Sequence, residues 1–459
     1  MKKQFIYAAL CIALMSSCSK DNDPGSISEP TTNTPDVIDE GSPVAIELGV
    51  GAPQVSVSTR GTGAAGTETE GDVALWDEQE LKILMTEKNS LVLAKEDPND
   101  ETSKYIFEGL TFKAPASTVK DPTQMKITNT DGAVKYYPLQ GAYDFYGFSF
   151  DDATLEGGTF EYPTTGEETR QITYTLTIDG TQDIMIAKAE LTADQQGGTT
   201  SENGKLAPND YSKAFSSWAA RRGVQPTMNF EHLLSRLDFV AKVGETVLGE
   251  ENIEVDESYP SNWPEADGYP QPIGNQLQNG VYIKGIKILN PKNKITVKIA
   301  DLDSPETIGI TNPIAEDNSE FTLQRRPDED EIIEKDSKKF LPLIPETPGI
   351  IKEKELEIGD GIMIVPGDNN FEMEIELMQY VMVNDGSSSG GQPEYAWKTA
   401  TLQTTVKLKE GETFQAGNYY TITATIFGFQ KIDVTATLSK WQEGGKIETN
   451  PEDDAFNQN

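Results

Sequence analysis

Cysteine and histidine are almost absent from this 459-residue sequence, which holds two cysteines, Cys11 and Cys18, and one histidine, His232. A zinc site of the usual type needs several such ligands, and a histidine-based catalytic triad needs partners that no motif here supplies. No cysteine follows residue 18, so no disulfide framework is expected in the exported chain. We therefore predict a protein that is not an enzyme, binds no cofactor or metal, and is stabilised by packing alone. His232 is expected to be a buried structural residue.

Positive charge is scarce as well. The chain has 38 Lys and Arg residues against 75 Asp and Glu residues, for a net charge of −37. Such a balance repels phosphate backbones, so nucleic acid is excluded as a partner. So many carboxylates form glycosidase-like pairs by chance, and none is singled out as catalytic. Solubility is the simplest account of the acidity.

Long hydrophobic runs are missing except at the N-terminus. There, two lysines precede the apolar stretch 5–15, which is too short to span a bilayer as a helix, and small residues lead on to Cys18. This order resembles a bacterial lipoprotein signal peptide, which is cut just before a cysteine that is then acylated. The resemblance implies a signal peptide over residues 1–17, a lipid on Cys18 and a surface-exposed, outer-membrane location. Residues 18–43, rich in Pro, Thr, Asp and Ser, are predicted to be a flexible tether.

Helical periodicity is also weak, and only residues 210–221 suggest a helix. Elsewhere apolar and polar residues alternate, most clearly over 172–178 and 371–377, which is typical of strands with one buried face. Residues 281–299 are expected to form a hairpin with a β-bulge at Gly285. Short strands separated by Gly and Pro favour an all-β sandwich architecture.

A composition shift near residue 226 suggests a domain boundary. About 440 residues remain after export, enough for two sizeable cores. We predict two tandem β-sandwich domains, at 61–226 and 227–441, followed by a polar acidic tail at 442–459.

Aromatic residues gather in one stretch of alternating sequence: Tyr143, Phe145, Tyr146, Phe148 and Phe150. Alternating aromatics in a strand more often fill a core than bind a ligand. If these rings faced solvent, however, they could stack on sugars. A surface glycan-binding lipoprotein is therefore retained as an alternative function.

Several short motifs follow one another along the chain. They are the lipoprotein signal, Thr59-Arg60-Gly61, Tyr137-Pro138 with residues 141–146, Asp183-Ile184-Met185, residues 230–237, Ile364-Val365-Pro366 and a final strand ending at Trp441. In this order they resemble the fimbrillin family, the subunits of type V pili in Bacteroidetes. The resemblance spans almost the whole exported chain and implies two sandwich-like domains of transthyretin-like topology.

The resemblance also implies a route of assembly. In that family an Arg-specific protease cuts the lipoprotein precursor after an arginine in an exposed loop. The strand ahead of the cut leaves an apolar groove, which a strand from a neighbouring subunit then fills. Here the implied cut lies between Arg60 and Gly61, and residues 44–60 are the plug and processing segment. Four alternating apolar residues of the plug would fill the groove: Val44, Ile46, Leu48 and Val50.

A second set of four alternating apolar residues lies near the C-terminus: Ile432, Val434, Ala436 and Leu438. It is either a donor strand for another subunit or an ordinary edge strand. The implied partners are other pilus subunits bound by β-strand addition, the outer membrane through the lipid on Cys18, and ligands on host or bacterial surfaces. Tip, accessory and stalk positions stay open, because the polar tail differs from a good stalk donor strand. An uncut pilus anchor is a further alternative.

Overall fold

The computed structural model describes residues 42–51, 68–70, 73–76, 78–116, 119, 125–163, 170–243, 281–324, 356–384, 394–426 and 432–439. Five of the features expected above lie outside this part of the chain: the signal peptide at 1–17, the lipidated Cys18, the cut between Arg60 and Gly61, the tail at 442–459 and nearly all of the tether.

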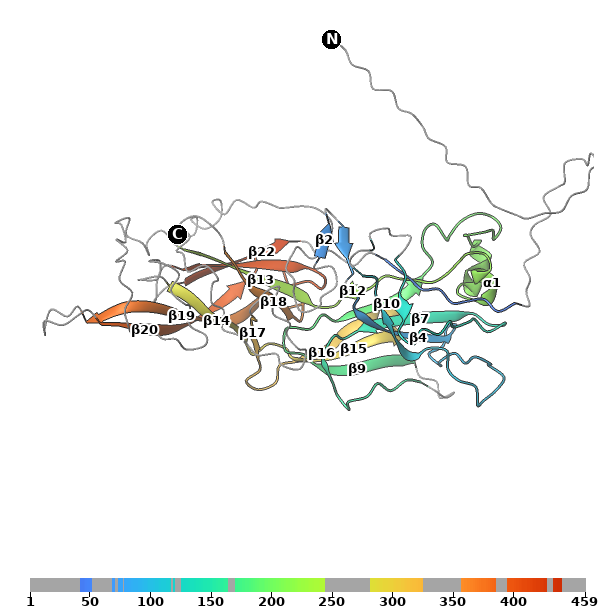
Figure 1. Cartoon of the computed structure of the whole chain (residues 1–459), viewed down its shortest axis with the longest axis horizontal. Helices are drawn as coiled ribbons and strands as arrows, with labels where there is room; N and C mark the ends of the chain where they lie inside the picture. Colours follow the sequence, from blue (N-terminus) through green and yellow to red (C-terminus); the bar gives the residue numbers. More distant parts are fainter. Residues whose placement is uncertain are drawn as a thin grey trace, which may run out of the picture. The chain divides into compact units, whose positions relative to one another are not determined.

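Among the described residues, the largest sheet has eight strands, and Figure 1 shows where several of them lie in the fold. Its order is β1 (Gly49–Val50), β11 (Thr227–Met228), β10 (Met185–Glu190), β7 (Tyr143–Ser149), β4 (Glu80–Glu87), β5 (Glu108–Lys113) and β6 (Thr128–Asn129), with β12 (Glu231–His232) also paired to β10. Most neighbours are antiparallel, but β1 runs parallel to β11.

Three four-stranded sheets and one hairpin complete the β-structure of the described residues. One sheet has the order β16 (Gly309–Ile314), β15 (Lys294–Asp301), β9 (Gln171–Thr177) and β8 (Thr154–Leu155). Another has β18 (Leu356–Ile364), β13 (Ser235–Val243), β21 (Tyr419–Ile426) and β22 (Ile432–Ser439). The last has β17 (Glu320–Thr322), β14 (Val281–Leu289), β19 (Asn370–Asn384) and β20 (Glu394–Lys407). The hairpin joins β2 (Glu68–Glu70) to β3 (Val73–Leu75).

Within the described residues, helix is confined to short pieces, and the predicted all-β architecture is confirmed. The expected helix at 210–221 is present only as the 3-10 helix η2 (Pro208–Lys213) and the α-helix α1 (Ser217–Ala220). They are separated at Phe215, whose φ of 58° is incompatible with a continuous helix. A second 3-10 helix is η4 (Pro305–Thr307). In the described part of the chain, none of these helices has the length and apolar character needed to cross a membrane.

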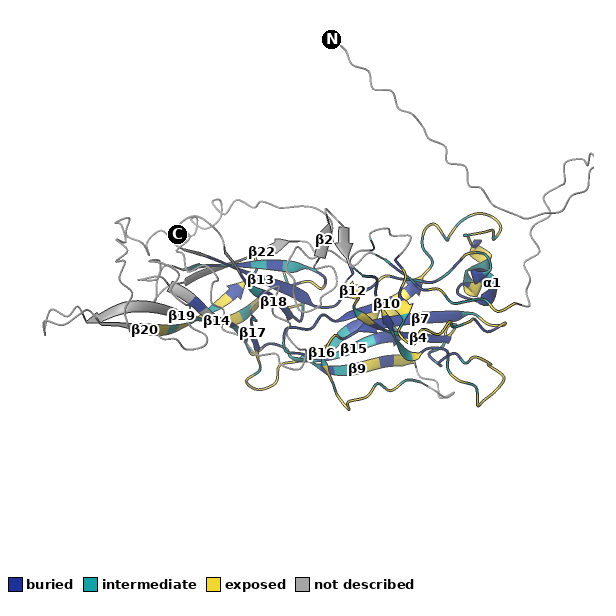
Figure 2. Cartoon of the chain, in the orientation of Figure 1, coloured by how far each residue is buried: buried dark blue, intermediate teal, exposed yellow. Residues whose placement is uncertain are grey.

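Strand β7 lies between two cores, and Figure 2 shows it buried along its whole length. Its odd-numbered residues Tyr143 and Phe145 belong to one hydrophobic cluster, and its even-numbered residues Tyr146 and Phe148 belong to the other. Because side chains alternate along a strand, a sheet covered on both faces needs apolar residues at consecutive positions. The dense aromatic run at 143–150 is therefore explained by burial on both sides.

Two predicted strands have the expected pattern of burial. In β9, Ile172, Tyr174 and Leu176 are buried, while the residues between them are exposed or half-buried. In β19, Met373, Ile375 and Leu377 are buried, and the intervening glutamates are not. The bulge at Gly285 is also confirmed, since the register of β14 against β19 shifts between Ile283 and Gly285.

The expected hairpin at 281–299 was wrong. Strand β14 pairs with β17 and β19, whereas β15 pairs with β16 and β9, so the two strands belong to different sheets. The connection is fixed by other segments, because the Asn290 amide donates to the Ser319 carbonyl and the Ile178 amide to the Asn293 carbonyl. Alternation identifies a strand but not its neighbour.

The strands on the two sides of residue 226 share a sheet. β15 and β16 follow this residue in sequence, yet β15 pairs with β9, which precedes it, from Lys294 opposite Thr177 to Asp301 opposite Gln171. The described residues from Ser42 onward belong to one compact unit. The boundary near 226 stays a prediction, and any division there would have to separate β15 from β9.

Candidate functional site

One extended segment near the N-terminus lies between two neighbours. This inserted segment, residues 44–51, runs antiparallel to residues 125–127 and 135–137 on one side and parallel to β11 on the other. It contains all four residues of the expected plug. A segment in this position has its backbone groups paired on both sides, as in the interior of a sheet.

The pairing with residues 125–137 is the more extensive. Four amide–carbonyl bonds of 2.9–3.1 Å join the two segments: Tyr137 to Val44, Ile46 to Lys135, Ile127 to Leu48, and Val50 to Met125, the donor being named first. Two bridged pairs lie between these bonds, Ala45 opposite Tyr136 and Gly49 opposite Lys126. Both are non-hydrogen-bonded pairs, in which facing side chains come closest.

The opposite side is paired partly by backbone and partly by a side chain. The amides of Gly49 and Gly51 donate to the carbonyls of Pro226 and Met228, both at 3.0 Å. Two residues before β11, the carboxamide of Gln225 takes the place of a strand neighbour. Its Oε1 accepts from the Glu47 amide at 3.4 Å, and its Nε2 donates to the Ala45 carbonyl at 3.2 Å.

Two side chains of the inserted segment belong to the core. Leu48 and Val50 are each 3% exposed and lie in the cluster that contains Tyr143 and Phe145. Val44 and Ile46 are half-buried against the same cluster. Full burial of such side chains stabilises a fold by about 1.5–3 kcal/mol each. Removal of the segment would therefore expose an apolar groove and two unpaired edges.

The ends and the outer face of the segment are held by polar contacts. Arg221 donates from Nη2 to the Ser42 carbonyl, ahead of the segment. Lys126 and Glu47 form an ion pair on the outer face, where both side chains are about half exposed. At the other end, the indole Nε1 of Trp76 donates to the Gly51 carbonyl at 2.8 Å. Trp76 is buried and comes after the expected cut site in sequence.

The C-terminal candidate strand is paired within its own chain. β22, which holds Ile432, Val434, Ala436 and Leu438, pairs antiparallel with β21 from Ile426 opposite Ile432 to Tyr419 opposite Ser439. It is the last strand in the order of its sheet. Its use as a donor strand stays a prediction.

The aromatic cluster does not form a sugar-stacking platform. Tyr143, Phe145, Tyr146 and Phe148 are at most 3% exposed, and Phe150 is 6% exposed. A ring stacks on a sugar only through an accessible face, so the glycan-binding alternative loses the residues on which it depended.

His232 is buried, as expected, within a polar network that sequence reasoning did not identify. Its Nδ1 lies 2.8 Å from Oδ1 of Asp183, and both side chains are almost fully buried. Nearby, the buried Arg236 donates from Nε to Asp238 at 2.8 Å and from Nη2 to the Asp360 carbonyl at 3.0 Å. Burial alone would lower the pKa of the Arg236 guanidinium, but the surrounding carboxylates, Asp238 foremost, raise it above its ordinary value.

These residues join segments that are distant in sequence. Asp183 precedes β10, Arg236 lies in β13 and Asp360 in β18. A buried charge is tolerated when it is paired and hydrogen-bonded, so the network has a structural explanation. The motifs at 183–185 and 230–237 were noted only for the family resemblance, and the fold brings them together with Asp360.

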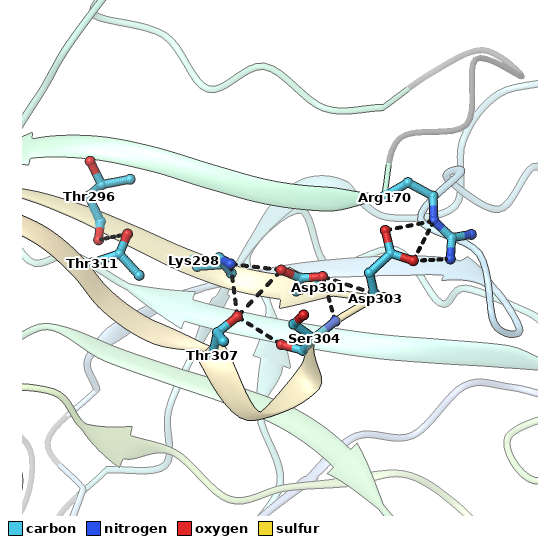
Figure 3. A network of polar contacts seen from close by, with 8 residues as sticks. All are labelled: Arg170, Thr296, Lys298, Asp301, Asp303, Ser304, Thr307 and Thr311. Atoms are coloured by element: carbon cyan, nitrogen blue, oxygen red, sulfur yellow. Dashed lines mark hydrogen bonds and ion pairs between the residues drawn. The ribbon is translucent and has the colours of Figure 1, made fainter.

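A second polar network braces the turn between β15 and β16 (Figure 3). Asp301 accepts from Lys298 at 2.7 Å and from the amides of Asp303 and Ser304, both at 2.9 Å. The hydrogen bond from Lys298, followed by that from the Ser304 amide, lowers the pKa of Asp301 to about 2. Arg170, just before β9, binds Asp303 with its closest contact at 2.6 Å. The network thus ties β15 to the strand beside it.

Among the described residues there is no cluster of three or more His, Cys, Asp or Glu side chains that could hold a metal ion.

No family model and no curated protein matches the chain. Solved structures do, at low similarity. A candidate cell adhesion protein of Bacteroides uniformis is 13% identical, with 88% of this chain and 99% of that one covered, at a TM-score of 0.39. A tip fimbrial protein of Porphyromonas gingivalis is 10% identical, with 86% and 100% covered and a TM-score of 0.32. A fimbrial anchor protein of the same organism is 10% identical, with 87% and 98% covered and a TM-score of 0.29.

Proposed function

We propose that this chain is a subunit of a cell-surface pilus that is exported as a lipoprotein and accepts a strand from a neighbouring subunit. The observation that carries the proposal is the position of residues 44–51. They are bonded to a neighbour on each side and contribute Leu48 and Val50 to the core, yet they lie close to the N-terminus and ahead of Arg60. A strand so placed can be replaced without unthreading the rest of the chain.

In the proposed sequence of events, the lipid on Cys18 holds the precursor at the outer membrane while residues 44–51 fill their own groove. A cut between Arg60 and Gly61 separates both the lipid and the inserted segment from the body of the protein. The contacts of the segment then become non-covalent. A strand supplied by another subunit competes for the same backbone groups and the same apolar positions.

The energetics favour assembly once the segment has left. When the groove is empty, the burial of Leu48 and Val50 is lost, which costs about 1.5–3 kcal/mol for each side chain. The backbone groups along both edges of the groove also lose their hydrogen-bond partners. The free groove is therefore a high-energy state, which is relieved when an extended strand binds. This role requires accepting a strand and not donating one, in agreement with the polar tail after Trp441. It suits a tip or accessory subunit; an anchor would retain its lipid and remain uncut.

The test uses purified precursor and an Arg-specific protease. We expect cleavage after Arg60, release of the segment that ends there, and formation of multimers with a partner subunit. The matched control is Arg60→Lys, which keeps the charge but removes the cleavage site, so cuts at other arginines can be recognised. If the segment stays bound after the cut even when partner subunits are in excess, the strand-exchange function is wrong.

A further inference from the structure

The outer face of the groove carries an unusual concentration of exposed apolar side chains. Among the described residues, four large apolar side chains are exposed, and three of them lie within 134–139, the segment that pairs with residues 44–46. These three are Val134, Tyr136 and Leu139, at 61%, 49% and 62% exposure. Tyr136 is the one that directly faces the inserted segment.

The inserted segment covers Tyr136 poorly. Ala45 is opposite Tyr136 in a non-hydrogen-bonded pair, the geometry in which facing side chains approach most closely. A single methyl group cannot shield a tyrosine ring. The next outward positions are Glu47, paired with Lys126, and Gly49, which has no side chain. The inward face of the segment thus fits its core, whereas its outward face leaves contacts unmade.

The outward positions differ in the room that they offer. At Gly49, an added Cβ would come to 3.3 Å from Oγ1 of Thr227, tighter than an ordinary contact. Above Ala45 the ring of Tyr136 is half exposed, so a larger side chain can pack on it. Between them, Lys126 favours an acidic residue. The outward positions of a strand in this groove therefore favour an apolar residue in place of Ala45, an acidic residue at the position of Glu47 and a small residue at the position of Gly49.

We propose that Tyr136 and Lys126 select the strand that replaces residues 44–51. The occupant is an extended strand of another subunit, parallel to β11, with a bulky apolar residue opposite Tyr136 and an acidic residue beside Lys126. This inference rests on the proposed strand exchange and adds to it a reason why the incoming strand displaces the resident one. The inward side chains of the resident strand fit the core, and its outward face is mismatched at one position, Ala45 opposite Tyr136.

The preferences of Tyr136 and Lys126 can be compared with the sequence of β22, the candidate donor strand of a second copy. When its four apolar residues are placed inward, with Ile432 in the position of Val44, Asp433 stands opposite Tyr136 and Thr435 beside Lys126. The acidic residue then faces the aromatic ring, and the lysine has no carboxylate. In this register, β22 of a second copy does not supply the residues that fit Tyr136 and Lys126.

The experiment uses the full precursor cut after Arg60, with the resident segment still seated. Synthetic peptides of residues 42–51 carrying native sequence, Ala45→Val or Glu47→Lys compete for the groove, and displacement of the labelled resident segment is measured. We expect Ala45→Val to displace the segment about two- to fivefold more effectively than the native peptide, the range expected for one cross-strand pair. Tyr136→Ala in the precursor should abolish this difference. Leu139→Ala, which removes an equally exposed apolar side chain that is not opposite Ala45, should preserve it.

The charge position has its own test. The Glu47→Lys peptide should compete less well than the native peptide, and Lys126→Glu in the precursor should reverse the order, with the difference shrinking at high salt. If the peptides displace the segment but Tyr136→Ala leaves the ratio unchanged, the proposed selection is overturned while strand exchange stands. If no peptide displaces the segment, strand exchange itself fails and the selection falls with it.

Discussion

The indole Nε1 of Trp76 donates a hydrogen bond of 2.8 Å to the carbonyl oxygen of Gly51. These residues lie on opposite sides of Arg60, so a cut there leaves the donor in the body of the protein and the acceptor in the inserted segment. Trp76 is 1% exposed and packs edge-on against Phe230, with 5.8 Å between the centroids of the two rings. The bond therefore joins the segment to the aromatic core of the part that it would leave.

Trp76→Phe should loosen the segment without emptying the core. The phenyl ring retains most of the packing, but the Gly51 carbonyl loses its donor, at a cost of about 0.5–1.5 kcal/mol. We expect faster hydrogen exchange of the Val50 and Gly51 amides than in the unmodified protein, with little change at β9. Equal protection in both proteins would show that the bond does not hold the segment.

Leu48→Ala should be severely destabilising. Leu48 is 3% exposed in the core, and truncation of such a side chain typically costs about 2–5 kcal/mol. Glu47→Ala, at the adjacent outward position, is the matched control, because an exposed ion pair is worth about 0–1 kcal/mol. Urea denaturation of the three proteins measures both effects. Similar losses for the two variants would contradict an inward–outward division of the segment.

Local pattern predicted individual strands well and their partners poorly. Alternation at 172–178 and 371–377 identified which residues are buried, because one face of each strand contacts a core. The pairing of β15 with β9 was missed, because nothing in either strand encodes a partner more than a hundred residues away.

The candidate site divides in the same way. The four apolar residues at 44–50 were recognised from their spacing, and the structure places two of them deep in the core. Gln225 was not recognised. Its carboxamide bonds the Glu47 amide and the Ala45 carbonyl in place of a neighbouring strand, because the fold brings it beside them. No sequence pattern predicts such a role.

Acid should weaken the turn between β15 and β16 within a defined pH window. The pKa of Asp301 falls from an ordinary value of 3.8 to about 2 in the folded protein, through the bonds from Lys298 and the Ser304 amide. A carboxyl with a lowered folded pKa contributes stability above its unfolded pKa and loses it as the pH falls through the folded one. The midpoint temperature of thermal unfolding of the native protein should thus fall as the pH is lowered from about 4 to about 2. Asp301→Asn, which has no charge to lose, should shift less over this window, and an identical shift would exclude Asp301 as a contributor.

Arg236→Met tests the buried network that joins β13 to β18. The substitution keeps an unbranched apolar side chain but removes the cation that bonds Asp238 and the Asp360 carbonyl. Breaking a buried ion pair costs about 3–5 kcal/mol, and here the half-buried Asp238 carboxylate and the Asp360 carbonyl both lose their donor. Arg236→Lys should rescue only part of this loss, since a single ammonium cannot reproduce the planar fork of the guanidinium.

Arg170→Met is the matched control: its ion pair with Asp303 is at least half exposed and is worth about 0–1 kcal/mol. In urea denaturation, the free energy of unfolding of Arg236→Met should be well below that of the Arg170→Met control. Comparable stability of the two variants would mean that packing, and not the charge network, holds β13 against β18.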